Sequence, residues 1–315
     1  MARKSAWSPA VAILGFLVGV GAVSALPAQE PVVQAKITKQ LEAGKKALRD
    51  GKYETALRAF AKADKLSDGG STTAVLELAA AHLRLSHFLE AEAQAEKAVA
   101  MAALPDEQAV AYNLMGTALS RRYETIPLAQ KDDRELTLTS AESAFRKSLD
   151  LTGGDLAVAW SNLALVLERQ RRLEEAQAAL QEYLDRAPSD TSARDRQAQI
   201  EATLAWRAKT TQAIVDRKLF KVAGDGEVLP PQKISAPPPQ YQKEDRKAGI
   251  QGLIILGAII DEEGNVADVT VLKGASKSLN EAAVEAARKW KFKPATRNGE
   301  PVAVLFNLTI NFRLQ

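Results

Sequence analysis

A recurring segment centred on alanine is the feature that most restricts how this chain can fold. The segment at residues 53–60 recurs at 88–95, 138–145 and 173–180, and the alanines at its fourth position are 35, 50 and 35 residues apart. A period of this length indicates a stack of similar helical units, because each unit buries its apolar face only against its neighbours. Residues 37–190 are therefore predicted to form a helical array with four copies of one helix pair.

A small residue lies twelve positions before the alanine in three copies, as Gly44, Ala79 and Ala164, and Gly116 is its counterpart in the third copy. Small residues at this position let two helices approach closely while large side chains fill the remaining gap. The pattern resembles the tetratricopeptide repeat (TPR). The fourth copy matches that repeat best, at Trp160, Leu163, Ala164, Leu167, Ala176, Leu180, Tyr183 and Pro188.

The third copy departs from the repeat because Gly116 and Ala141 are 25 residues apart instead of 12. Thirteen extra residues therefore lie within residues 121–135, where loops accept additions. The insertion is interpreted as a local contact surface or as tolerated length, and the second is favoured. Residues 191–221 are predicted to form a final amphipathic helix that caps the last repeat, with apolar side chains at Ile200, Leu204, Ile214 and Val215.

An arginine follows the small residue by five positions in every copy, at Arg49, Arg84, Arg121 and Arg169. Stacked repeats would align these arginines in a column on or beside the concave face, where an acidic partner could bind them. A cation near a helix C-terminus is also stabilising without any ligand, by about 0.3–1 kcal/mol. The second interpretation is favoured, and the column is kept as a candidate partner-binding site.

The N-terminus has the order of features found in export signals. Arg3 and Lys4 precede an apolar run over residues 9–23, and small residues follow at 23–28. Residues 1–28 are predicted to be either a cleaved signal peptide or a retained membrane anchor, because the run is nearly long enough to span a bilayer. Cleavage is favoured because glycines weaken the helix and Pro27 follows a small-residue motif.

The composition changes at residues 222–240, where five of the thirteen prolines occur, and this stretch is predicted to be a semi-extended linker. Beyond it, residues 241–315 are predicted to form a small domain with β-β-α-β order. A hairpin turns at residues 261–265, a capping box at residues 278–281 starts a helix, and Asn298-Gly299 forms a second turn. The fold class is therefore α+β multidomain, with an all-α repeat array followed by a small antiparallel-sheet domain.

This last domain resembles the C-terminal domain of the TonB family. The most specific string is Arg-Lys-Trp-Lys-Phe-Lys-Pro-Ala at residues 288–295, followed by Gly-Glu-Pro-Val at 299–302. The resemblance implies docking on an outer-membrane receptor, where an extended receptor segment pairs with the sheet by strand addition. It carries over to Gln240, Tyr241, Asn307, Thr309, Asn311 and Arg313. One departure is Gln242, which stands where the family usually has proline.

Two alternatives exist for these C-terminal positions. They could form an ordinary solvated strand face, or their edge could pair in a homodimer. The basic residues around Trp290 and Phe292 could suggest nucleic acid, but the domain's charge is nearly balanced and the two aromatic residues are predicted to be core. No nucleic-acid partner is expected.

Chemistry-bearing residues are scarce. The chain contains no cysteine and only two histidines, His82 and His87, which are five residues apart and therefore not on one helical face. It also lacks the local motifs of nucleotide, hydrolase and metalloprotease sites. No enzyme activity, cofactor or metal is expected.

The sequence therefore predicts an exported periplasmic interaction protein of a Gram-negative bacterium. Its sheet domain would bind an outer-membrane TonB-dependent receptor or another envelope protein, and its repeats would bind partner proteins. Coupling to inner-membrane motor proteins requires a retained anchor. The alternative is a soluble periplasmic scaffold without energy transduction.

Overall fold

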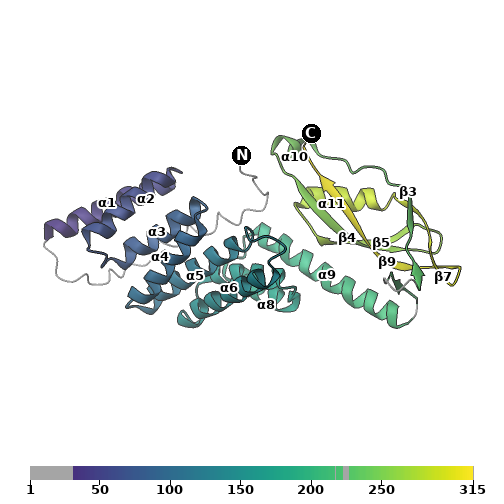
Figure 1. Ribbon diagram of the computed structural model, residues 1–315, viewed down its shortest axis with the longest axis horizontal. Helices are drawn as coiled ribbons and strands as arrows, with labels where there is room; N and C mark the ends of the chain where they lie inside the picture. The colour runs from purple at the N-terminus through teal and green to yellow at the C-terminus, as the bar shows by residue number, and fades with distance from the viewer. Residues whose placement is uncertain (1–30, 217, 223–226, 315) are drawn as a thin grey trace. The chain divides into compact units, whose positions relative to one another are not determined.

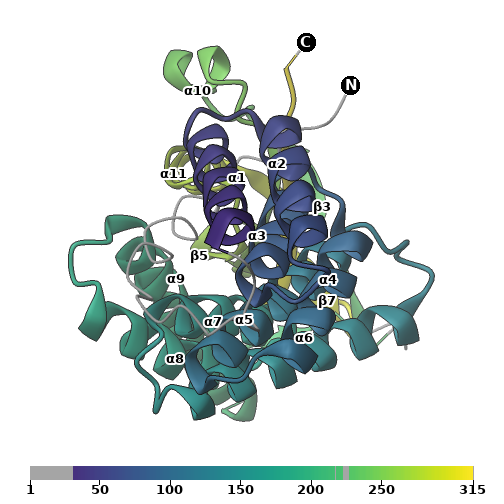
Figure 2. The ribbon, with the colours of Figure 1, turned by 90° about the vertical axis from the view of Figure 1, so that its left-hand side faces the viewer.

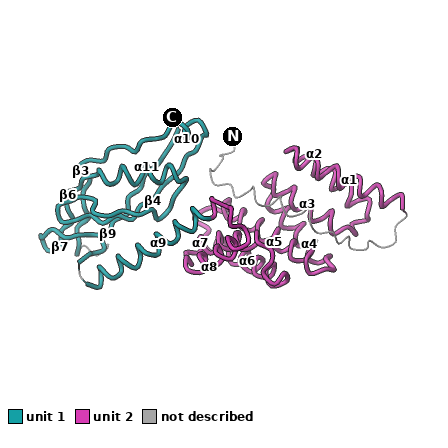
Figure 3. The backbone as a smooth tube through the Cα atoms, turned by 180° about the vertical axis from the view of Figure 1, so that it is seen from behind, with its two compact units in different colours: residues 1–11, 194–315 teal, residues 12–193 magenta. Residues whose placement is uncertain are grey.

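The computed structural model describes residues 31–216, 218–222 and 227–314. Contacts divide these residues into two compact units, 31–193 and 194–314, which Figure 3 colours separately. The predicted signal peptide or anchor at residues 1–28 lies outside the described residues. Among the helices of the described ranges, none has the length and apolarity needed to cross a membrane.

The first unit is a row of antiparallel helix pairs, as Figures 1 and 2 show from two directions. Each predicted repeat supplies one pair, so the helical-array part of the predicted fold class is confirmed. The helices are α1 (Pro31–Arg49), α2 (Tyr53–Leu66), α3 (Thr72–Arg84), α4 (Phe88–Met101), α5 (Pro105–Arg122), α6 (Lys131–Leu151), α7 (Ala157–Arg169) and α8 (Leu173–Arg186).

A residue in the left-handed backbone region ends the first helix of three pairs at the same repeat position. These residues are Gly51, Ser86 and Arg171, with φ of 71°, 61° and 63°. A residue in the left-handed backbone conformation ends a helix and lets the chain reverse direction within a short turn. In the third pair the insertion replaces this turn and lengthens α6 to 21 residues.

Close helix approach within the pairs follows from the small residues picked out in the sequence. Phe60 and Phe145 are fully buried, and their rings lie where side chains at Gly44 and Gly116 would stand. A Cβ atom at Gly116 would lie 2.8 Å from the Phe145 ring, and one at Gly44 would lie 2.3 Å from the Phe60 ring. The predicted complementarity of small and large residues is confirmed.

The second unit is an antiparallel sheet with short additional strands. Its helices are α9 (Thr191–Val215, of which residues 194–215 belong to this unit), α10 (Lys243–Lys247) and α11 (Lys277–Ala287). Its strands are β1 (Phe220–Lys221), β2 (Val228–Leu229), β3 (Gln232–Ser235), β4 (Gly252–Ile260), β5 (Val266–Lys273), β6 (Lys291–Lys293), β7 (Ala295–Arg297), β8 (Glu300–Val302) and β9 (Val304–Phe312).

The main sheet has the strand order β1-β9-β4-β5, and all its pairs are antiparallel except β1 with β9. The predicted hairpin joins β4 to β5, and the Asn298-Gly299 turn joins β7 to β8. Helix α11 packs on one face through Leu279, Ala283 and Ala287, which are fully buried. The predicted helix start differs by two residues, because Ser276 is the N-cap and its Oγ accepts from Leu279 N at 3.3 Å.

Helix α9 differs from the predicted capping helix, because residues 194–215 belong to the same compact unit as the sheet. Trp206 is 6% exposed and lies over Gly257 of β4. Figure 1 shows α9 on the sheet face opposite α11. Gln199 Nε2 donates to Val271 O of β5 at 2.7 Å. The sheet is thus enclosed between two helices, one more than the β-β-α-β prediction contained.

The proline-rich stretch corrects another prediction, because its described part, residues 227–240, is not a free linker. Strand β2 pairs with β7, and β3 pairs with β6, both antiparallel. Trp290 Nε1 also donates to Pro237 O at 3.1 Å. Prolines favour the extended backbone that was predicted, and an extended backbone has donors and acceptors free to pair with a neighbouring strand.

Candidate binding surfaces

Strand β9 offers an open edge along most of its length. Strand β4 pairs with all of β9, but on the other side β1 pairs only with Val304 and Leu305. Phe220 N donates to Ala303 O at 2.9 Å, so the backbone groups of Ala303 point away from β4. Because these directions alternate along a strand, the N–H and C=O groups of Asn307, Thr309 and Asn311 also point away from β4.

The side chains of these three residues are exposed, while Leu308, Ile310 and Phe312 are buried. The predicted alternation of the strand is therefore confirmed. Among the described residues, no hydrogen bond reaches the outward backbone groups of Asn307, Thr309 or Asn311. An unpaired row of donors and acceptors is what an added strand requires.

Side chains of α9, which lies on one face of the sheet, also reach the opposite edge at β5. Val271 O of β5 accepts from Gln199 Nε2 at 2.7 Å and from Thr203 Oγ1 at 3.4 Å. Lys209 also forms an ion pair with Asp268 of the same strand. These contacts leave β9 as the less obstructed edge of the sheet.

The other predicted sheet residues lie near the end of β9. The Tyr241 hydroxyl donates to Ile250 O, and its ring packs edge-on against Phe312 with centroids 5.4 Å apart. Burial and the Asp245 carboxylate raise the pKa of the Tyr241 phenol. Gln240 and Arg313 are exposed. Tyr241 thus supports the end of β9 from the core side, while Gln240 and Arg313 are available at the surface.

The aromatic residues of the family-like string are core residues, as predicted. Trp290 is 7% and Phe292 4% exposed, and the rings are 6.4 Å apart. Lys291, which lies between them, and Lys293, which follows Phe292, are exposed.

Electrostatic interactions link Arg121 to two other predicted arginines, Arg84 and Arg169. Arg121 lowers the pKa of both Arg84 and Arg169, although burial is the larger cause in each case. Arg169 has structural partners, because its guanidinium donates to Ser120 O at 2.9 Å and forms an ion pair with Glu124. Arg49 is exposed at the end of α1. Arg169 therefore binds the C-terminal end of the neighbouring helix α5.

The two histidines lie closer together than their spacing suggested. His82 is in the last turn of α3 and His87 is the N-cap of α4, and their Nδ1 atoms are 3.4 Å apart. Burial and then His87 lower the pKa of His82. The turn between the helices brings the rings together, which an argument confined to one helix missed. Across the described ranges, no three acidic or histidine side chains are grouped to hold a metal ion.

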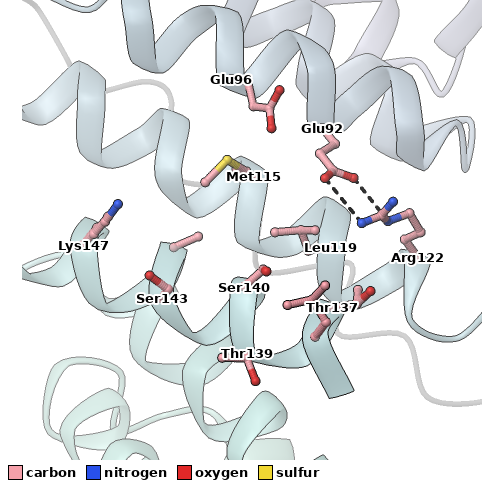
Figure 4. Close-up of a pocket in the computed structure, with 12 residues that line it drawn as sticks. Glu92, Glu96, Met115, Leu119, Arg122, Thr137, Thr139, Ser140, Ser143 and Lys147 are labelled. Atoms are coloured by element: carbon pink, nitrogen blue, oxygen red, sulfur yellow. Dashed lines mark hydrogen bonds and ion pairs between the residues drawn. The ribbon is translucent and has the colours of Figure 1, made fainter. Parts of the chain in front are cut away.

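A groove of about 430 Å³ lies between α4, α5 and α6 (Figure 4), and it was not predicted. Glu92 and Arg122 form an ion pair at one end, with 3.2 Å between Oε2 and Nε. Its residues come from positions 92–147, so no local motif could reveal it. The signal available in the sequence was the insertion in the third repeat.

Comparison with known proteins identifies the C-terminal part. Residues 237–314 match the family described as Gram-negative bacterial TonB protein C-terminal. The chain is 42% identical over 78 residues to Protein TonB of Xanthomonas campestris pv. campestris (strain B100) and 33% identical over 78 residues to Protein TonB of Vibrio cholerae serotype O1 (strain ATCC 39315 / El Tor Inaba N16961). These matches span 24% of this chain and 35% and 32% of the relatives, about a third of their length.

Solved structures similar to the chain include a "Crystal structure of MamA protein", with 20% identity and a TM-score of 0.42 over 58% of this chain and 88% of that chain. Another is "MamA 41-end from Desulfovibrio magneticus RS-1", with 15% identity and a TM-score of 0.44 over 57% of this chain and 92% of that chain. The predicted resemblance of the C-terminal domain to the TonB family is confirmed by the family match.

Proposed function

We propose that this chain is a periplasmic binding protein whose sheet domain captures an extended segment of an outer-membrane receptor at β9, while its helical array binds partner proteins. The role is binding, without catalysis. The observation that carries the proposal is the unpaired edge at Asn307, Thr309 and Asn311. The TonB-type family match supports the choice of a receptor segment as the ligand.

The edge can accommodate a short strand. From Asn307 to Asn311, three residues direct both an N–H and a C=O outward, which offers six backbone groups for pairing. A typical backbone hydrogen bond contributes about 0.5–1.5 kcal/mol net, so even a partial ladder would give measurable affinity. The exposed side chains of the same three residues would contact alternate side chains of the incoming segment.

Thr309→Pro tests this edge with little damage to the sheet. The Thr309 N–H points away from β4, so proline there removes an outward donor and leaves the β4 ladder intact. The proline ring also occupies the space of the incoming backbone. We expect at least tenfold weaker binding of the full chain to labelled peptides from the periplasmic plug segments of TonB-dependent receptors.

Thr309→Ala is the matched control, because it keeps the N–H and should retain most of the affinity. Fluorescence anisotropy measures both variants, and circular dichroism checks that both are folded. Equal affinity of the proline variant and the parent chain would show that the segment binds elsewhere.

Coupling to an inner-membrane motor requires residues 1–28 to remain as an anchor. We propose the energy-transducing role for an anchored form and the scaffold role for a cleaved form, with the same β9 edge in both. Intact mass and membrane partition of the protein from its native envelope separate the two. A homodimer through β9 would appear as a doubled mass in solution.

In the helical array, we propose that an acidic segment of a partner protein binds the arginine column. The charge of Arg121 acts on both Arg84 and Arg169, and a bound carboxylate would offset this repulsion. Arg169 already has partners in the array, so Arg121 is the member best suited to test the column.

A further inference from the structure

The inserted third repeat builds a surface that the regular repeats lack. Helix α6 has 21 residues, whereas α2, α4 and α8 have 14 each. Its extra turns precede Leu138, the residue that corresponds to the start of the other second helices. Leu136 and Thr137 on these turns line the groove between α4, α5 and α6, and Figure 4 labels Thr137. The insertion therefore extends one wall of the groove.

The groove combines an apolar floor with a hydroxyl-rich wall. Met115, Leu119 and Ala144 supply the apolar surface, and Leu136 stands at its margin with 67% of its surface exposed. A large aliphatic side chain left this exposed costs the isolated protein free energy that a partner's apolar side chain could recover. The α6 wall adds the hydroxyl groups of Thr137, Thr139, Ser140 and Ser143.

The α4 wall is acidic. Glu92 and Glu96 lie one turn apart, and burial raises the pKa of Glu92, with Glu96 adding to the effect. Arg122 compensates Glu92 through their ion pair. Within the described part of the chain, Glu96 has no ion-pair partner, and Figure 4 shows its carboxylate on the groove side of α4. Lys147 is engaged with the Tyr112 ring at 5.2 Å.

We propose that this groove binds an amphipathic helix of a partner protein, one that presents an aliphatic side chain beside a lysine or arginine. The aliphatic side chain would cover Leu136 and the floor, and the cation would pair with Glu96. The inference rests on the array acting as a partner-binding module, as proposed above, but it uses a different surface from the arginine column. It also assigns a purpose to the insertion.

The test uses the full chain and a fluorescein-labelled helical peptide built from leucine and lysine, with a leucine and glutamate peptide of the same pattern as comparison. We expect Leu136→Ser and Glu96→Gln each to weaken binding of the lysine peptide about tenfold. Leu89→Ser and Glu90→Gln are matched controls. They alter an exposed leucine and an exposed glutamate of α4 that do not line the groove, so they should leave the affinity unchanged.

Three outcomes would overturn the proposal: equal weakening by the control variants, equal affinity for the glutamate peptide, or no binding of the lysine peptide to the parent chain. Arg121→Gln tests acidic-peptide binding by the arginine column separately from peptide binding in the groove. Loss of acidic-peptide binding in that variant, with the lysine peptide unaffected, would support the column whatever happens at the groove. Circular dichroism of each variant confirms that the helices are intact.

Discussion

Replacing Trp206 with alanine tests whether α9 is an integral layer of the sheet domain. Trp206 is 6% exposed, and a buried tryptophan removes roughly 150–250 Å² from water. At about 25 cal/mol per Å² this corresponds to an upper limit of roughly 4–6 kcal/mol. Measured tryptophan or phenylalanine truncations in cores cost about 3–5 kcal/mol. We therefore expect Trp206→Ala to destabilise the sheet unit by about 3–5 kcal/mol.

Hydrogen exchange measured by mass spectrometry on the full chain can assign this loss to particular strands. Amides of β4 and β5 should exchange roughly two to four orders of magnitude faster, since their opening free energy falls by the same amount. Amides of α3 and α7 serve as an internal reference in the other unit. Arg207→Ala is the matched control, because Arg207 is the exposed neighbour of Trp206 and should shift stability by less than about 0.5 kcal/mol. If both variants exchange alike at β4 and β5, Trp206 does not hold α9 on the sheet.

Two further predictions concern the array. Gly116→Ala should destabilise it by about 1–3 kcal/mol, because the new Cβ would lie 2.8 Å from the Phe145 ring; an unchanged urea midpoint would contradict this close packing. His82 should make stability depend on pH, because its folded-state pKa is lowered below 6.5 and the folded state favours the neutral ring. The contribution of His82 to stability is fully present above about pH 6.5. It is lost as the pH falls from there through the folded-state pKa, since the unfolded chain binds the proton more readily than the folded one. The urea midpoint of unfolding should therefore decrease as the pH is lowered from 7.5 to 5.5. His82→Gln should make this decrease smaller.

Periodic features were predictable because each depends on residues close in sequence. The helix pairs follow from the spacing of Ala56, Ala91, Ala141 and Ala176, and the exposed face of β9 follows from strict alternation. Family resemblance located the sheet domain for the same reason, through one continuous string at residues 288–295.

The features that were missed depend on contacts between distant segments. Ile200 and Leu204 give α9 an apolar stripe that could cover a helix or a sheet, and the deciding contact is Trp206 against Gly257. The prolines before Tyr241 correctly indicated extended backbone, but the pairing of β2 and β3 depends on strands sixty residues later. The groove is lined by Glu96, Met115 and Leu136, which come from three different helices. No single periodic pattern in the sequence connects these positions.

Because α9 side chains bond Val271 O at the β5 edge, β9 is the edge at which the sheet is more open to growth. Two copies joined through β9 would each consume the other's open edge, so the pair would be closed and could not extend into a filament. The same closure would leave no edge for a receptor segment. Self-association and receptor capture would then be mutually exclusive, and the local concentration of the protein would set how much of it is ready to bind.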